Sequence, residues 1–236
     1  MCGRASLSKV EKELEKRFMA SFYSADLERY QLLPSYNIAP THLHPVITNE
    51  DREHLQYFRW GLIPYWAKEA GIGSRMINAR LETITEKSAF KHAIQYRRCI
   101  IPFDGFYEWK KIDRAKVPYR IHLKDQAIFA VAGIWEKWLS PTEEIIFSFS
   151  VITQPANTFM APIHDRMPAI LLAEDEQRWI DPTLSTEDAL QLIQPYPDDA
   201  MQAYTVSERV NKVRENDIDL IKEVPYKAPP KQGTLF

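Results

Sequence analysis

Cysteine is nearly absent from this chain, since Cys2 and Cys99 are its only two among 236 residues. Two cysteines are too few for a disulfide framework and favour a reducing compartment. No apolar run approaches the roughly 18 residues that a membrane-spanning helix needs. The start of the chain also lacks the basic and then apolar pattern of a signal peptide. We therefore expect a cytoplasmic protein with no membrane partner.

Several common functional motifs are also missing. The sequence contains no G-x-G-x-x-G, no G-x-x-x-x-G-K-[ST] and no G-x-S-x-G, which argues against the usual dinucleotide, P-loop and serine-hydrolase sites. His42, His44 and His54 raise the question of a metal site, but neither a second ligand pair nor a C-x-x-C accompanies them. We interpret these histidines as surface residues and expect no metal or other cofactor.

The charge is small overall but unevenly distributed. The formal net charge is −2, which by itself argues against a nucleic-acid-binding protein. Residues 75–120, however, hold eleven Lys and Arg against five Asp and Glu, whereas residues 174–220 hold four against twelve. Such a chain can present one positive groove. Charges that simply solvate separate faces explain the counts equally well.

The apolar runs are mostly short and rich in β-branched and aromatic residues, which is typical of strands. We expect strands at Pro45–Thr48, Leu55–Leu62, Cys99–Pro102, Phe106–Lys110, Tyr119–Leu123, Ile128–Trp135, Ile145–Thr153 and Ala169–Leu172. We expect helices at Thr83–Gln95, Glu174–Ile180 and Thr186–Ile193, and a further one after a capping box at Ser8–Glu11. This pattern predicts a single α+β domain, residues 1–224, on a mainly antiparallel, curved or barrel-like sheet. Residues 225–236 are expected to form an extended tail.

The first candidate functional residue is Cys2, which directly follows the initiator methionine. Methionine aminopeptidase generally removes Met1 when the next side chain is small. Removal would leave an α-amine and a thiol two carbons apart on Cys2, and these two groups together can close a five-membered ring on an aldehyde. A frayed terminus with an incidental cysteine is the alternative.

Three further segments carry polar residues that local propensity does not explain. Asn78 and Arg80 lie in "INAR", ahead of an expected helix, where Asn also serves as a helix cap. Glu108 lies between Tyr107 and Trp109. A desolvated carboxyl there has a raised pKa suited to acid–base catalysis, unless a nearby Lys pairs with it. His164, in "PIHDRMP", lies in a proline-bounded loop, where a His–Asp pair is either functional or a plain surface hydrogen bond.

Seven segments in order resemble the SRAP family (SOS-response-associated peptidase), whose members crosslink abasic sites in single-stranded DNA. The segments are "MCGR", "YNIAP", "RWGLIPYW", "INARLET", "RCIIPFDGFYEWK", "PIHDRMP" and "VSERVNKV". The resemblance implies a catalytic set of Cys2, Asn78, Glu108 and His164. The thiazolidine formed by Cys2 would protect the lesion during the DNA damage response.

The resemblance also implies contacts to single-stranded DNA. Basic contacts to the backbone would come from Arg4 and Arg80. A wedge that splays the strand would come from Trp66 and Pro40. Asn37, in "YNIAP", joins this set, and Lys87 stands where some members carry an arginine. We expect a monomer that is cytoplasmic and associates with the nucleoid when it binds DNA.

Three other functions remain open on the residues alone. Class II glutamine amidotransferases also begin with Met-Cys-Gly, so Cys2 is compatible with an N-terminal-nucleophile amidohydrolase, which needs an oxyanion hole near the thiol. A thiol peptidase pairing Cys2 with His164, acting on the protein's own first peptide bond, is the second. A passive single-strand binding module in which Cys2 is incidental is the third.

The last five residues, "QGTLF", fit the Q-x-x-L-F pattern of bacterial sliding-clamp ligands. Gln232, Leu235 and Phe236 would fill the clamp's pockets, while the preceding "KAPPK" keeps the peptide extended. Packing of the two apolar residues on the domain's own surface is the alternative. A clamp is therefore a second candidate partner.

Overall fold

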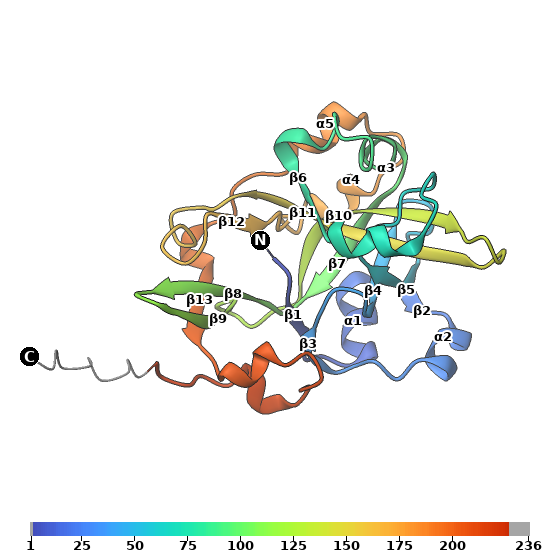
Figure 1. The fold of residues 1–236 in the computed structure, drawn as a ribbon. Helices are drawn as coiled ribbons and strands as arrows, with labels where there is room; N and C mark the ends of the chain where they lie inside the picture. Colours follow the sequence, from blue (N-terminus) through green and yellow to red (C-terminus); the bar gives the residue numbers. More distant parts are fainter. Residues whose placement is uncertain (1, 227–236) are drawn as a thin grey trace, which may run out of the picture.

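A five-stranded barrel forms the centre of the protein, in a computed structural model that describes residues 2–226 (Figure 1). Four antiparallel pairings give the order β11-β10-β7-β4-β5, and a parallel pairing of β11 with β5 closes the ring. These strands are β4 (Leu43–Thr48), β5 (His54–Trp60), β7 (Arg98–Phe103), β10 (Phe129–Leu139) and β11 (Ile145–Pro155). The expected α+β fold on a barrel-like sheet is confirmed.

Paired residues of neighbouring barrel strands pack closely. Ile101 on β7 (Arg98–Phe103) and Val131 on β10 (Phe129–Leu139) lie opposite each other, and both are fully buried. Gly133 on β10 pairs with Cys99 on β7, and a Cβ at Gly133 would lie 2.9 Å from the Cys99 sulfur. A side chain at this glycine would therefore collide with the side chains of Cys99 and Ile101 on β7.

A second sheet packs beside the barrel and carries the start of the chain. Its order is β13-β9-β8-β1-β3. The strands are β1 (Ala5–Leu7), β3 (Ser35–Ile38), β8 (Gly105–Ile112), β9 (Ala115–Leu123) and β13 (Met201–Thr205). Because β1 lies between β3 and β8, with Ala5 opposite Phe106, the residues just before β1 run beside the middle of β8.

The end of β11 organises two short strands from distant parts of the chain. β6 (Asn78–Arg80) pairs with it in parallel, with Asn78 opposite Val151. β12 (Arg166–Pro168) pairs with it in antiparallel fashion, with Arg166 opposite Pro155. Strand β11 therefore holds the "INAR" and "HDR" segments on the same part of the molecule.

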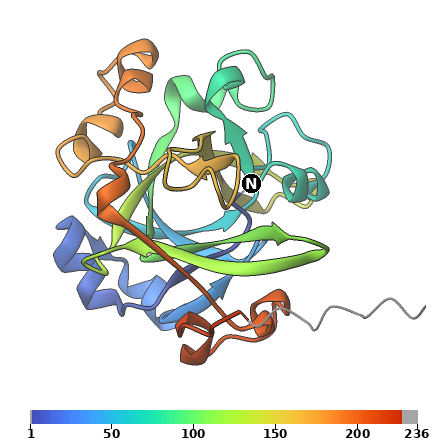
Figure 2. The same ribbon diagram turned by 90° about the vertical axis from the view of Figure 1, so that its left-hand side faces the viewer.

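Short helices and one small strand cover the rest of the surface (Figure 2). They are α1 (Glu11–Phe18), β2 (Ser21–Phe22), α2 (Ser24–Arg29), α3 (Lys91–Tyr96), α4 (Glu176–Trp179) and α5 (Thr186–Gln191). Residues 2–226 also form five 3-10 helices: η1 (Ala70–Arg75), η2 (Leu81–Thr83), η3 (Asp198–Ala200), η4 (Glu208–Asn211) and η5 (Ile218–Ile221). None of the helices in residues 2–226 is long and apolar enough to cross a membrane.

Two helix boundaries differ from those expected. The helix expected at Thr83–Gln95 begins only at Lys91, because a 3-10 turn and an irregular stretch occupy the first half. Ser8 does not cap α1, since its hydroxyl and its N–H both donate to the buried carboxylate of Asp104. The first turn of α1 is held instead by Glu13, whose carboxylate accepts from the N–H of Val10 at 3.0 Å.

The last expected strand and the histidines also need correction. The strand expected at Ala169–Leu172 is β12, three residues earlier, and only Ile170 forms an isolated bridge, to Val131.

His44 is buried, not on the surface as we expected, and its Nε2 lies 2.7 Å from the carbonyl oxygen of Pro102. Burial lowers its pKa to about 4. Within residues 2–226 no three His, Cys, Asp or Glu side chains gather as a metal site requires.

Candidate active site

Cys2 is held in the interior by Asn78. The residue is fully buried where the chain enters β1. The side-chain amide of Asn78, on β6, donates a hydrogen bond to the Cys2 carbonyl oxygen at 2.8 Å. The other amide atom of Asn78, Oδ1, is also buried and accepts no hydrogen bond within residues 2–226. Asn78 is therefore a strand residue that positions Cys2, and not the helix cap that we considered.

Glu108 provides a buried carboxyl group next to Cys2. It is only 3% exposed on β8, and burial raises its pKa above the ordinary 4.5, while His164 acts in the opposite direction. Burial also raises the pKa of the Cys2 thiol, and the carboxylate of Glu108 raises it further. The expected desolvation of Glu108 is confirmed. The antiparallel pairing of β1 with β8, in which the N–H of Tyr107 donates to the Arg4 carbonyl at 2.9 Å, brings Cys2 and Glu108 close together.

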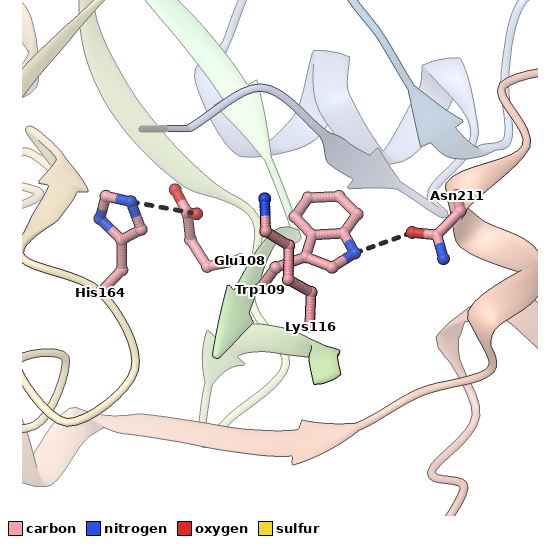
Figure 3. Close-up of a pocket in the computed structure, with 5 residues that line it drawn as sticks. All are labelled: Glu108, Trp109, Lys116, His164 and Asn211. Atoms are coloured by element: carbon pink, nitrogen blue, oxygen red, sulfur yellow. Dashed lines mark hydrogen bonds and ion pairs between the residues drawn. The ribbon is translucent and has the colours of Figure 1, made fainter. Parts of the chain in front are cut away.

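His164 approaches Glu108 from the loop between β11 and β12 (Figure 3). Its Nε2 lies 3.9 Å from a carboxylate oxygen of Glu108. The N–H of Arg166 donates to His164 Nδ1 at 2.9 Å, which leaves Nε2 as the ring nitrogen that faces Glu108. The Asp165 carboxylate also lies 2.9 Å from Nδ1, but Asp165 is 85% exposed and screened by water.

A cavity of about 490 Å³ opens beside the Glu108–His164 pair. Trp109, Lys116 and Asn211 complete its lining (Figure 3). The indole N–H of Trp109 donates to Asn211 Oδ1 at 2.8 Å, which fixes the plane of the ring. Sequence reasoning missed Lys116 because it is one of several charged residues of the β8–β9 hairpin. Asn211 lay within the quoted "VSERVNKV" segment and could have been found there.

The structure corrects one of the expected DNA contacts, Asn37, whereas the contact of Arg4 with the DNA backbone stays a prediction. Asn37 is 1% exposed, so it has no surface for DNA, and its amide donates to the carbonyls of Lys212 and Glu215 at 3.1 and 2.8 Å. Arg4 is half-buried, and its guanidinium donates to Asn37 Oδ1 at 2.7 Å and to the carbonyl of Val210. Both residues hold the segment that carries Asn211.

The other expected DNA contacts lie on the surface. Arg80 and Lys87 are exposed and, together with Asn78, line a cavity of about 370 Å³ to which Arg75 also contributes. We call this the basic cavity. Trp66 is 47% exposed, whereas Pro40 is partly buried. The wedge formed by Trp66 and Pro40 stays a prediction.

The fold and the site together define a class of protein. A buried cysteine next to the start of the chain, an asparagine on its carbonyl and a Glu–His pair meet where β1, β6 and β8 approach the loop before β12. The model of the SOS response associated peptidase (SRAP) family matches residues 1–213. The chain therefore belongs to this family.

Relatives are found in bacteria and animals. The abasic site processing protein YoqW of Bacillus subtilis is 43% identical over 225 residues, which cover 94% of this chain and 99% of YoqW. The abasic site processing protein HMCES of Xenopus tropicalis is 31% identical over 259 residues, which cover 92% of this chain and 76% of HMCES. A crystal structure of a Bacteroides thetaiotaomicron protein superposes on this chain with a TM-score of 0.89 at 32% sequence identity. The superposition covers 95% of this chain and all of the Bacteroides chain.

Proposed function

We propose that this protein captures abasic sites in single-stranded DNA through a thiazolidine that Cys2 forms once Met1 has been removed. The observation that carries the proposal is the arrangement of Asn78 and Glu108 around Cys2, with His164 behind Glu108. The names of the relatives, which are abasic site processing proteins, support the same substrate.

The reaction begins with the amine, because burial keeps the thiol protonated. An abasic deoxyribose equilibrates with a ring-opened aldehyde, whose carbon the neutral α-amine of Cys2 attacks to give a carbinolamine. Glu108, whose raised pKa keeps it protonated to higher pH than an exposed carboxyl, donates a proton to the departing hydroxyl. Water leaves, and the product is an imine protonated on nitrogen (an iminium), with Glu108 left as a carboxylate.

The second half of the reaction closes the ring. The sulfur of Cys2 adds to the iminium carbon, the carbon–nitrogen double bond becomes single as its electron pair moves to nitrogen, and the nitrogen keeps its proton. Glu108, now a carboxylate beside the thiol, accepts the thiol proton. The balance is one aldehyde and one aminothiol giving one thiazolidine and one water. His164 faces Glu108 with Nε2 and would donate to the opened sugar or to the carboxylate.

The surroundings of the site fit a DNA strand without reading any base. Arg80 and Lys87 in the basic cavity would hold phosphates on the Asn78 side. Lys116 lines the cavity on the Glu108 side, where it would hold a phosphate next to the lesion. A missing base is itself the recognised feature, so positive charge along the backbone and access to the sugar suffice.

The test uses a single-stranded oligonucleotide with one abasic site, analysed on a denaturing gel. The wild type and Cys99→Ala, which alters the other buried cysteine, should give a covalent band. Cys2→Ala should give none, yet borohydride should trap its imine, since the amine is still present. An equal band from Cys2→Ala, or from intact DNA, would contradict the proposal. Thiol-dependent amide hydrolysis without a band would favour the amidohydrolase or peptidase function.

A further inference from the structure

Three aromatic side chains stand in a row on the surface near the basic cavity. Tyr65 is 56% exposed, Tyr96 is 62% exposed, and the His92 side chain between them is 40% exposed. The ring of His92 lies 5.0 Å from that of Tyr65 and 5.2 Å from that of Tyr96, centroid to centroid. We call Tyr65, His92 and Tyr96 the aromatic row. Nothing assigned so far to catalysis or lesion binding includes these side chains.

The aromatic row continues from the wall of the basic cavity. Phe90 lines that cavity, and His92 and Tyr96 follow it on α3, one helical turn apart and so on one face. The segment of Tyr65 is tied to the same wall, because the N–H of Leu62 donates to the carbonyl of Met76 at 3.1 Å, and Met76 also lines the cavity. The exposed cations Arg75, Arg80 and Lys87 therefore lie next to exposed rings.

A buried ion pair lies against the aromatic row. Glu136 is buried beneath it and forms an ion pair with Arg97, whose guanidinium lies over the ring of Trp135 at 5.3 Å. Burial and the charge of Arg97 both lower the pKa of His92. Its Nδ1 lies 3.5 Å from the Glu136 carboxylate but makes no hydrogen bond there. His92 is therefore an uncharged flat ring at neutral pH.

Exposed aromatic rings next to basic side chains are typical of surfaces that bind single-stranded DNA. In such surfaces the basic side chains contact the phosphate backbone and the rings stack on the bases. We propose that the aromatic row stacks the bases of the single-stranded DNA that leaves the basic cavity on the side away from Cys2. The protein thus binds several nucleotides on one side of the abasic site. This inference rests on the proposed function for its ligand, but it concerns a different part of the strand.

The experiment measures fluorescence anisotropy with oligonucleotides that carry a tetrahydrofuran abasic analogue, which has no aldehyde and cannot crosslink. A short oligonucleotide has two nucleotides on each side, and two longer ones add six nucleotides on the 5′ or the 3′ side. One of the two extensions should tighten binding by the wild type. Tyr65→Ala and Tyr96→Ala should each lose about tenfold on that extended oligonucleotide. Binding of the short one should not change.

Matched variants separate stacking from damage to the fold. Tyr65→Phe and Tyr96→Phe keep the rings and should bind like the wild type. Tyr23→Ala removes another exposed tyrosine stacked on a histidine, at a ring distance of 4.1 Å from His54, and should change nothing. Tyr23 directly precedes α2, and it lines neither the basic cavity nor the cavity beside Glu108.

The outcomes that overturn the inference are distinct from those that overturn the proposed function. Equal losses on short and extended oligonucleotides, or no loss in the Ala variants, remove the aromatic row as a DNA surface. The same holds if neither extension tightens binding by the wild type. Crosslinking of the short oligonucleotide with a natural abasic site is measured separately. If the wild type forms no crosslink there, the proposed function fails whatever the anisotropy shows.

Discussion

Asn37→Ala is the sharpest test of the role that the structure gives to Asn37. The side chain is buried, and its amide donates to three carbonyls of the segment before η5, at 2.8 Å to Glu215, 3.1 Å to Lys212 and 3.4 Å to Val210. Its oxygen accepts from Arg4, a half-buried cation. An alanine leaves all of these groups without their partner in a place that water does not easily reach.

The expected loss of stability follows from these contacts. The two shorter amide bonds contribute about 1 kcal/mol each, and the charge-assisted bond to Arg4 about 2 kcal/mol, whereas the 3.4 Å contact adds little. The total is about 4 kcal/mol. For a chain of this size each kcal/mol shifts the melting temperature by about 2–4 °C, so we expect a decrease of about 10 °C.

Calorimetry of Asn37→Ala and Asn216→Ala measures the effect. Asn216 accepts from the N–H of Tyr36 at 2.7 Å in an exposed position, so water replaces it and its loss should cost about 1 kcal/mol. Because Asn37 touches no phosphate in our account, the slope of log affinity against log salt should not change. A melting temperature within about 1 °C of the wild type, or a shallower salt slope, would refute the assignment.

Four further predictions concern the reaction and the ends of the chain. Glu108→Gln should slow crosslinking by about 10²–10⁴-fold. It should also remove from the pH–rate profile the inflection that Glu108 causes above pH 4.5 in the wild type, and an unchanged profile would exclude Glu108 as the titrating group. Lys116→Ala should weaken DNA binding and reduce its salt dependence by about one charge, whereas Lys124→Ala, just beyond the far end of β9, should do neither. The intact mass of active protein should lack methionine, and active protein that retains it contradicts the mechanism. Truncation after Lys231 should abolish binding to the sliding clamp in a titration; equal binding by both forms removes the clamp proposal, whose residues lie outside those that the structure describes.

Residue chemistry revealed the catalytic candidates better than it revealed their surroundings. Glu108 was recognisable as a carboxylate in an aromatic strand segment, between Tyr107 and Trp109, and its burial on β8 raises its pKa as expected. Asn78 was recognised, but its strand was not, since β6 is only three residues long and forms by pairing with β11. Short strands that depend on a distant partner leave no periodic pattern in their own sequence.

Asn37 shows the opposite failure. Family resemblance placed it on the DNA, whereas the structure shows its amide bonded to carbonyls of residues 210–215. A polar residue in a family motif can serve the fold as well as the ligand, and the sequence does not distinguish these roles. Only the burial of Asn37 does so.

The central place of β1 in the second sheet sets an order of events during synthesis. The strand at Ala5–Leu7 emerges first from the ribosome, but its partner β8 at Gly105–Ile112 follows roughly 5 to 20 seconds later at the usual pace of translation. During that interval the start of the chain is open to the enzyme that removes methionine. Once β8 docks, Cys2 is enclosed. Removal of Met1, which the proposed chemistry requires, must therefore occur before β8 docks. A chain that is translated faster, or processed more slowly, would fold with Met1 still attached.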